Sequence, residues 1–293
     1  MVMKPTPDSE THPKTRLWSF GGHTHTLGRF TLVMGIVNVT PDSFSDGGEY
    51  ATSESAIAHA LQLVEEGADI LDIGGESTRP KAAEVTLEEE LARVIPVIEA
   101  LSDKTNVPIS IDTTKAEVAR QAIQAGAIIV NDISGLRLDP EMIPLCAAHQ
   151  EVGVICMHMQ GTPRTMQENP HYENVVQEIC DFFKERVATL NSAGIAPERI
   201  VLDPGIGFGK SAAHNLEILK GVSVLQQAGR PVLIGHSRKR FIGKLLERQV
   251  NERIWGTVGI SIGLAQLGVD ILRVHDVRAT VDSLDAWRAV AED

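Results

Sequence analysis

Eight short apolar runs recur along the chain, and a segment with helical periodicity separates most runs from the next. The runs are residues 32–38, 69–73, 107–111, 127–131, 152–157, 199–202, 231–234 and 269–274. The helical segments are 53–66, 86–102, 115–125, 139–148, 171–193 and 214–228, with 251–267 or 276–290 near the end. Short apolar runs of this kind are typical of parallel strands that are buried on both faces. Eight strands alternating with helices over about 260 residues predict an α/β fold, a (β/α)8 TIM barrel.

A doubly wound open sheet is the alternative architecture. Its dinucleotide-binding form needs a Gly-x-Gly-x-x-Gly loop between a strand and a helix. Gly205, Gly207 and Gly209 have a different spacing, Lys210 follows them directly, and the sequence contains no Walker A motif. The barrel is therefore the favoured prediction.

The N-terminal region precedes this regular pattern. Residues 1–16 are polar and contain prolines, so we expect a disordered tail, and we expect residues 17–293 to form a single barrel domain. Residues 17–20 and 27–30 are apolar stretches that flank Gly-Gly-His-Thr, which predicts a β-hairpin before the barrel. His23 and His25 alternate along it, but no third ligand lies near them to complete a metal site.

Composition narrows the partners and the compartment. The net charge is −12, and no basic patch carries interleaved aromatic residues, which argues against nucleic acid and anionic membranes as partners. No apolar run reaches the roughly 18 residues of a membrane span, and the N-terminus lacks the apolar core of a secretory signal. The three cysteines, Cys146, Cys156 and Cys180, lie in strand-like or helix-like runs, as core thiols of a reducing compartment do. We therefore expect a cytoplasmic protein.

Polar side chains follow every predicted strand. The clearest case is Asp203, which ends a β-branched run and precedes Pro204 and three glycines that let the backbone approach a ligand. The polar residues at the other strand ends include Asn38, Asp72, Asp112, Asn131, Asp132, His158, His236, Ser237, Arg238, Lys239, Arg273 and His275. Because the carboxyl ends of barrel strands share one face, these side chains are candidates for a common site.

The candidates divide into two chemical groups. Asp112, Asn131 and Asp203 supply acceptors for a neutral heterocycle that presents N–H donors, and Lys239 supplies a donor to the same ring. The second group contains cationic or ring N–H donors suited to phosphate oxygens, namely Arg79, Arg273 and His275. A pocket with a heterocycle on one side and a phosphorylated group on the other is the interpretation that fits both groups.

Simpler roles are open for individual residues. Asp112 or Asp132 could cap a helix, and Arg238 or Arg273 could pair with a strand-end carboxylate. A zinc site built from the histidines at three strand ends is a further alternative. Asn38 and the acids near it suit Mg²⁺ bridged to phosphates better than a metal caged by protein ligands.

From about Val33 to Val277 the chain resembles the dihydropteroate synthases, within the pterin-binding TIM-barrel superfamily. Eight segments carry the resemblance, in order: Met34-Gly-Ile-Val-Asn-Val-Thr-Pro-Asp-Ser-Phe-Ser-Asp-Gly-Gly48, Asp72-Ile-Gly-Gly-Glu-Ser-Thr-Arg-Pro80, Ser110-Ile-Asp-Thr113, Asn131-Asp-Ile133, Met157-His-Met-Gln-Gly161, Asp203-Pro-Gly-Ile-Gly-Phe-Gly-Lys210, Ser237-Arg-Lys239 and Arg273-Val-His-Asp276. Each segment by itself is a weak indicator, but eight in this order are highly specific for the pterin-binding superfamily. The first two loops are specific for the synthases.

The resemblance implies a transferase that condenses 6-hydroxymethyl-7,8-dihydropterin diphosphate with p-aminobenzoate to give 7,8-dihydropteroate and pyrophosphate. It implies catalytic roles for Asp112, Lys239, Arg273 and His275, and pterin contacts by Asp112, Asn131, Met157, Asp203 and Lys239. It assigns p-aminobenzoate to Thr78, Arg79, Pro80, Phe208 and Ser237, and the diphosphate to Asn38, Arg273 and His275. It also implies Mg²⁺ at Asn38, inhibition by sulfonamides and a homodimer.

Two other functions share part of this pattern. A pterin-binding domain that presents a folate methyl group to a corrinoid protein would share Asp112, Asn131 and Asp203, but it would not need the loops after Asn38 and Asp72. A paralogue without synthase activity would not be expected to keep both loops. One departure from the family pattern is Arg240, where many relatives carry a small hydroxyl residue, and it would place an added cation near the p-aminobenzoate carboxylate.

Overall fold

The computed structural model describes residues 15–40, 48–77, 84–162 and 165–291. Eight parallel strands form one sheet in the order β8-β7-β6-β5-β4-β3-β10-β9. Their bounds are β3 Leu32–Asn38, β4 Ile70–Gly74, β5 Ile109–Asp112, β6 Ile129–Asp132, β7 Gly153–Met157, β8 Ile200–Asp203, β9 Leu233–Ile234 and β10 Ile271–Val274. The sheet closes into a barrel between β8 and the residues just before β9. There Leu202 bridges to Val232, and the Leu202 N–H donates to the Pro231 carbonyl at 2.9 Å.

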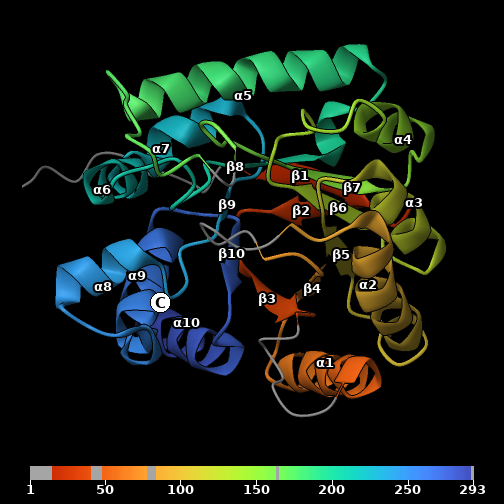
Figure 1. The fold of residues 1–293 in the computed structure, drawn as a ribbon. Helices are drawn as coiled ribbons and strands as arrows, with labels where there is room; N and C mark the ends of the chain where they lie inside the picture. The colour runs from red at the N-terminus through yellow and green to blue at the C-terminus, as the bar shows by residue number, and fades with distance from the viewer. Residues whose placement is uncertain (1–14, 41–47, 78–83, 163–164, 292–293) are drawn as a thin grey trace, which may run out of the picture.

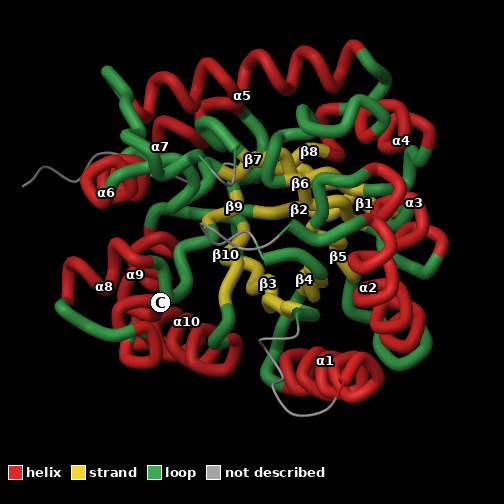
Figure 2. The backbone as a smooth tube through the Cα atoms, viewed as in Figure 1, coloured by secondary structure: helices red, strands yellow, loops and turns green. Residues whose placement is uncertain are grey.

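Helices surround the strands (Figure 1), and the tube view shows the strands at the centre with helices outside them (Figure 2). The α-helices are α1 Gly48–Glu65, α2 Leu87–Ser102, α3 Ala116–Gln124, α4 Met142–Ala148, α5 Val175–Ser192, α6 Ala212–Lys220, α7 Val222–Leu225, α8 Arg240–Leu246, α9 Ile254–Gln266 and α10 Val277–Ala291. Short 3-10 turns lie at Pro197–Arg199 (η2), Gln226–Ala228 (η3) and Val250–Glu252 (η4). No helix within these described ranges is both long and apolar enough to cross a bilayer.

Strand alternation divides the core into two parts. The outward side chains of the strands pack under the helices in one large cluster. The inward side chains near the strand starts form a second cluster, which contains Met34, Ile70, Ile129, Ile155, Val201, Leu233 and Ile271. Continuing this alternation along each strand places polar residues inside the barrel near the strand ends. The apolar layer therefore seals one end of the barrel and leaves the other for chemistry.

A β-hairpin covers the sealed end. Strands β1 (Arg16–Phe20) and β2 (His23–Leu27) pair antiparallel around a two-residue Gly-Gly turn. Trp18 is fully buried against the inward apolar layer, and its Nε1 donates to the Arg199 carbonyl at 3.2 Å. Arg16 pairs with the buried Asp270 at 2.7 Å. The hairpin thus fills the barrel end opposite the strand-end residues.

The barrel and the hairpin confirm the predicted fold class, and closure excludes the open sheet. A capping box of Thr86 and Glu89 begins α2, inside the predicted helical segment 86–102. Both candidate C-terminal helices exist. The second hairpin strand was wrongly placed at residues 27–30, because the turn needs only Gly21 and Gly22. The expected helix over 214–228 is interrupted at Gly221, and α8 was not predicted. Residues 1–14 of the expected tail lie outside the described residues, and strand β1 begins at Arg16.

Candidate active site

Arg273 lies at the centre of the polar end of the barrel and contacts two carboxylates. Its Nε lies 2.5 Å from Asp72 Oδ2, and its Nη2 lies 2.7 Å from Asp112 Oδ2. The Asn131 amide also donates to Asp72 Oδ2, at 3.1 Å. Burial opposes the charge of Arg273, but these carboxylates outweigh it and raise its pKa, so Arg273 remains a cation. The three acidic or amide side chains and the guanidinium form a floor that we call the acidic floor.

The two carboxylates of the floor differ in their surroundings. Asp72 is completely buried, and its Oδ1 has no hydrogen-bond partner among the described residues. The Asp112 side chain is 15% exposed, which makes it the carboxylate that a ligand can reach. Burial raises the pKa of Asp112 to about 7, although Arg273 acts in the opposite direction. A ligand that reaches Asp112 would therefore replace Arg273 as its hydrogen-bond partner.

Asp203 ends β8 beside this floor. It is 5% exposed, and its Oδ1 accepts a hydrogen bond from the Gly205 N–H at 2.7 Å. Burial raises the pKa of Asp203 to about 6, against the opposing effects of that hydrogen bond and of the Lys239 charge. Gly205 has φ +68°, and a Cβ there would lie 2.0 Å from the His158 carbonyl oxygen. Only glycine can hold the loop this close to the neighbouring strand end.

Lys239 and Phe208 stand where the floor meets a larger cleft. The Lys239 ammonium lies 4.4 Å from the centre of the Phe208 ring, within the range of a cation–π contact. Burial, followed by the charge of Arg273, lowers the pKa of Lys239 to about 8. Phe208 also packs against the methionine cluster that contains Met157, the predicted pterin contact.

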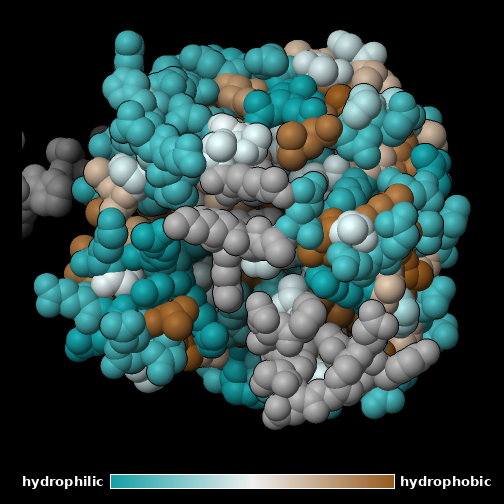
Figure 3. Space-filling model, in the orientation of Figure 1, coloured by the Kyte–Doolittle hydropathy of each residue, from teal (hydrophilic) through white to brown (hydrophobic). Residues whose placement is uncertain are grey.

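The cleft beyond Lys239 has a volume of about 630 Å³. The predicted residues Asn38, Phe208, Ser237, Lys239 and His275 all line it. The described residues that line it include no carboxylate, although the chain is acidic overall. The lining cations are Lys210, Arg238, Lys239, Arg240, Lys244 and Arg253. Its walls thus suit an anionic ligand. The face drawn in Figure 3 is mostly hydrophilic, with apolar side chains in small scattered groups.

His275 and Ser237 form a pair on one wall of the cleft. His275 Nδ1 lies 3.0 Å from Ser237 Oγ, and the same oxygen accepts from the His275 backbone N–H at 3.2 Å. Burial and the charge of Arg273 lower the pKa of His275 to about 3, so the ring is neutral at pH 7. When the Ser237 hydroxyl donates to Nδ1, the ring proton lies on Nε2, where it can bind an oxygen of a ligand.

The pairing of Ser237 and His275 is supported by a neighbouring ion pair. Arg238 binds both carboxylate oxygens of Asp276, at 2.9 and 2.5 Å. The backbone of Arg238 is left-handed, with φ 55°. This conformation costs free energy, and the bidentate ion pair offsets that cost. The sequence left open a simpler role for Arg238 and Arg273, namely an ion pair with a strand-end carboxylate. The structure contains such an ion pair for Arg238 and for Arg273.

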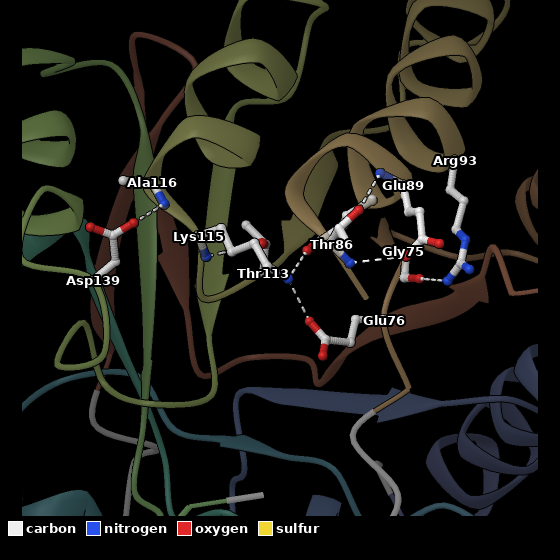
Figure 4. A network of polar contacts seen from close by, with 10 residues as sticks. Gly75, Glu76, Thr86, Glu89, Arg93, Thr113, Lys115, Ala116 and Asp139 are labelled. Carbon is white, nitrogen blue, oxygen red and sulfur yellow. Dashed lines mark hydrogen bonds and ion pairs between the residues drawn. The ribbon is translucent and has the colours of Figure 1, made fainter. Parts of the chain in front are cut away.

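Three predicted residues, Thr78, Arg79 and Pro80, lie outside the described residues. The base of their loop is anchored by two cations (Figure 4). Arg93 donates to the Gly75 carbonyl at 2.8 Å, and the Lys115 ammonium lies 2.6 Å from Glu76. Lys115 also contacts the buried Glu90 at 2.5 Å.

Sequence reasoning gave no role to Asp72 or Lys210, although both lie in quoted motifs. Asp72 lies in the middle of β4, and its position in the strand alternation, two residues after the inward-facing Ile70, is the signal that could have placed it in the barrel. The three histidines proposed as a zinc alternative have separate partners: Lys210 for His158, Thr257 and Ser261 for His236, and Ser237 for His275. Within the described ranges, no group of three His, Cys, Asp or Glu residues is arranged to hold a metal.

Comparison with known proteins identifies the family. Residues 34–275 match the model of the pterin binding enzyme family. The dihydropteroate synthase of Synechocystis sp. is 50% identical over 86% of this chain and 87% of its own length. The Xanthomonas albilineans dihydropteroate synthase, solved with 4-aminobenzoic acid, superposes with a TM-score of 0.89 and 49% identity, and it covers 96% of this chain and all of its own. The Yersinia pestis enzyme in a sulfonamide drug complex gives a TM-score of 0.88 and 42% identity, over 94% of this chain and 100% of its own. The chain therefore belongs to the pterin-binding enzyme family and, within it, to the dihydropteroate synthases, which are transferases of folate synthesis.

Proposed function

We propose that this barrel mouth condenses 6-hydroxymethyl-7,8-dihydropterin diphosphate with p-aminobenzoate and releases 7,8-dihydropteroate and pyrophosphate. The observation that carries the proposal is the contact between two unlike regions: a buried acidic floor and a cleft whose described charged side chains are all cations. Arg273 lies in the floor, and Lys239 lies at its junction with the cleft. A substrate with a neutral heterocycle joined to a diphosphate matches this arrangement.

The pterin ring belongs on the acidic floor. Asp112 and Asp203 accept from its amino and ring N–H groups, and Asn131 can both donate and accept. Lys239 donates to the carbonyl or a ring nitrogen, and Met157 packs against the ring. All four polar side chains are buried or half-buried, so their hydrogen bonds are formed away from competing water.

The diphosphate belongs where the floor opens into the cleft. The Nε2–H of His275 and the guanidinium of Arg273 supply donors to its oxygens. Asn38 ends β3 and lines the same cleft, and its amide oxygen is a suitable ligand for Mg²⁺. One protein oxygen fits this ion, because Mg²⁺ at such sites keeps waters and binds substrate phosphates. When bound, Mg²⁺ neutralises charge on the leaving diphosphate.

The p-aminobenzoate ring belongs in the cleft, beside Phe208, Ser237 and Lys239. Thr78, Arg79 and Pro80 are assigned to the same substrate by family resemblance. The amine of p-aminobenzoate would then face the pterin methylene carbon across Lys239. The cations that line the cleft favour the carboxylate end of this substrate by long-range attraction.

The reaction follows from these placements. The bond between the pterin methylene carbon and the diphosphate oxygen breaks, and the electron pair leaves with the diphosphate. Arg273 and His275 stabilise that departing charge, while Asp112 and Asp203 stabilise the cationic pterin. The nitrogen lone pair of p-aminobenzoate forms the new bond, and the nitrogen then loses a proton to solvent. A neutral arylamine is already nucleophilic, so no activating base is required.

Sulfonamides should compete with p-aminobenzoate for the cleft. They carry the same arylamine, and an acidic sulfonamide group stands where p-aminobenzoate has its carboxylate. The related Yersinia pestis enzyme was solved in a sulfonamide drug complex. We also propose a homodimer. Trp255 in α9 is 78% exposed and Val250 is 54% exposed, and a partner subunit would cover them. The three free, buried cysteines support a reducing, cytoplasmic location.

The proposal is tested by product formation. Purified protein is incubated with the pterin diphosphate, p-aminobenzoate and Mg²⁺, and 7,8-dihydropteroate is detected by mass spectrometry. Formation of the product in the complete mixture, and its loss when Mg²⁺ is chelated, is expected. A protein that binds the pterin but forms no product would be a binding module instead, as in the methyl-transfer alternative.

A further inference from the structure

Lys210 is a buried residue in the lining of the cleft. The residue roles implied by the family resemblance include none for Lys210. It is 3% exposed, and its ammonium has three acceptors within hydrogen-bond distance. The Phe208 carbonyl lies at 2.8 Å, His158 Nδ1 at 3.0 Å and the His158 carbonyl at 3.3 Å. An ammonium has three N–H donors, so each donor is used. Lys210 therefore ties the glycine-rich loop after β8 to the end of β7.

The bond to the Phe208 carbonyl is one of several that hold this loop by its backbone. The Gly207 carbonyl accepts from Gln167 Nε2 at 2.7 Å, and the Gly207 N–H donates to Asn215 Oδ1 at 2.7 Å. The Gly209 carbonyl accepts from the Tyr172 hydroxyl at 2.9 Å. The peptide groups on both sides of Phe208 are thus fixed by side chains from other parts of the chain.

The loop is also held too close to its neighbour to shift as a whole. Gly209 has φ +63°, and a Cβ there would lie 2.6 Å from the Gln160 carbonyl oxygen. With its backbone fixed, Phe208 presents its ring between the Lys239 ammonium and a cluster of Met157, Met159 and Met166. The ring is therefore a rigid wall where the acidic floor meets the cleft.

We propose that Lys210 is a positioning residue for the second substrate: it holds the Phe208 ring at the place where p-aminobenzoate must lie. This inference rests on the proposed function. Lys210 acts through the Phe208 backbone, so its loss should affect p-aminobenzoate more than the pterin, on which it acts only by lowering the pKa of Asp203. Its buried acceptors explain why N–H donors are required, because an apolar side chain of the same length would leave three acceptors unsatisfied.

The test is the variant Lys210→Met, measured in steady state with each substrate varied in turn. A misplaced wall should raise KM for p-aminobenzoate by about tenfold, since small displacements at a reacting pair have effects of this order or larger. KM for the pterin diphosphate, and the affinity for a pterin ligand measured by calorimetry, should change by less than about twofold. A purely structural role for Lys210 would change both substrates together or neither.

The matched control is Arg199→Met. Arg199 is also a buried cation bonded to backbone carbonyls, those of Cys146, His149 and Val152, at 2.6 to 2.8 Å. It precedes β8, whereas Lys210 follows that strand, so it lies at the sealed end of the barrel. Its loss should lower thermal stability and leave both KM values unchanged.

Tyr172→Phe keeps the inference testable where Lys210→Met does not fold. It removes only the hydroxyl that binds the Gly209 carbonyl, so the same selective rise in KM for p-aminobenzoate is expected, at about two- to threefold. Equal changes for both substrates, or an unchanged KM for p-aminobenzoate, in an active protein would overturn the inference and leave the proposed function intact. A wild-type protein that forms no dihydropteroate would overturn the proposed function, and the inference with it.

Discussion

Arg273 Nη2 and Asp112 Oδ2 meet at 2.7 Å, although their strands, β10 and β5, are separated by two others in the sheet. The family resemblance assigns Arg273 to the diphosphate and Asp112 to the pterin. The two residues lie in one ion-pair network, which also includes Asp72, so the two proposed subsites would share it. A substrate that binds both must exchange protein ion pairs for its own contacts.

The shared network predicts that Arg273→Ala weakens binding of both parts of the substrate. Loss of the guanidinium removes donors from the diphosphate and leaves Asp72 and Asp112 without their cation. The pKa of Asp112 should then rise further, so that it no longer offers an ionised acceptor at pH 7. Calorimetry should show losses of about 1–3 kcal/mol for pyrophosphate and for a pterin ligand. Unchanged pterin affinity would show that the pterin part of the substrate does not depend on the ion-pair network of Arg273.

His275→Ala should have the narrower effect. The ring contacts Ser237 and not the acidic floor, so pyrophosphate binding should weaken while pterin binding does not. Because burial lowers the pKa of His275 to about 3, it binds as a neutral donor. Pyrophosphate titrations between pH 5.5 and 8 should therefore show no histidine titration that the variant removes. A difference between wild type and variant that appears only below pH 6.5 would mean that a charged ring binds.

Asp203 should supply one step in the pH dependence of pterin binding, near pH 6, and Asp112, whose pKa is raised to about 7, should supply a second. The pKa of Asp203 is raised to about 6, mainly by burial, so the carboxyl is protonated below that pH and ionised above it. Affinity for a pterin ligand should therefore rise as the pH increases through about 6. Asp203→Asn should abolish the step near pH 6 and leave the step of Asp112, and it should cost on the order of 2–4 kcal/mol at pH 7, because an amide can turn a donor toward a donor. Retention of the step near pH 6 in the variant would mean that another group titrates there.

Arg240 should favour anionic arylamines. It begins α8 and lines the cleft, where the described residues supply no carboxylate. Arg240→Ser should lower kcat/KM for p-aminobenzoate by about three- to tenfold, while the uncharged 4-aminobenzamide should be affected much less. The effect should shrink at high salt. Equal losses for the acid and the amide would show that Arg240 acts through packing instead of charge.

Much of this fold could be predicted because the local signals agree with the global architecture. The buried strands are short apolar runs, and the Thr86–Glu89 capping box marks the start of α2. The strand-end rule then collected Asn131, Asp203 and Lys239 into one site. The short helix α8 escaped prediction because seven residues after a strand carry too little periodicity.

The strand ends indicated that Arg273 could pair with a carboxylate, but not that its partners are Asp72 and Asp112. Side-chain reach across a barrel depends on the tilt of the strands and on which inward positions share a layer. Asp72 was among the strand-end candidates, but it lies inside its strand, and its place in the sequence indicated no partner. Lys210 follows three glycines, and its burial arises from a loop fold that only tertiary contacts define.

The coupling of pyrophosphate release to dihydropteroate formation shows whether this barrel mouth condenses the two substrates. Wild-type protein and Asp203→Asn are each supplied with the pterin diphosphate, p-aminobenzoate and Mg²⁺, and both products are quantified over time. The account predicts that the wild type releases one pyrophosphate for each 7,8-dihydropteroate formed and that the variant forms far less of both. No pyrophosphate release above a protein-free control, or release without any dihydropteroate while p-aminobenzoate is saturating, would contradict it.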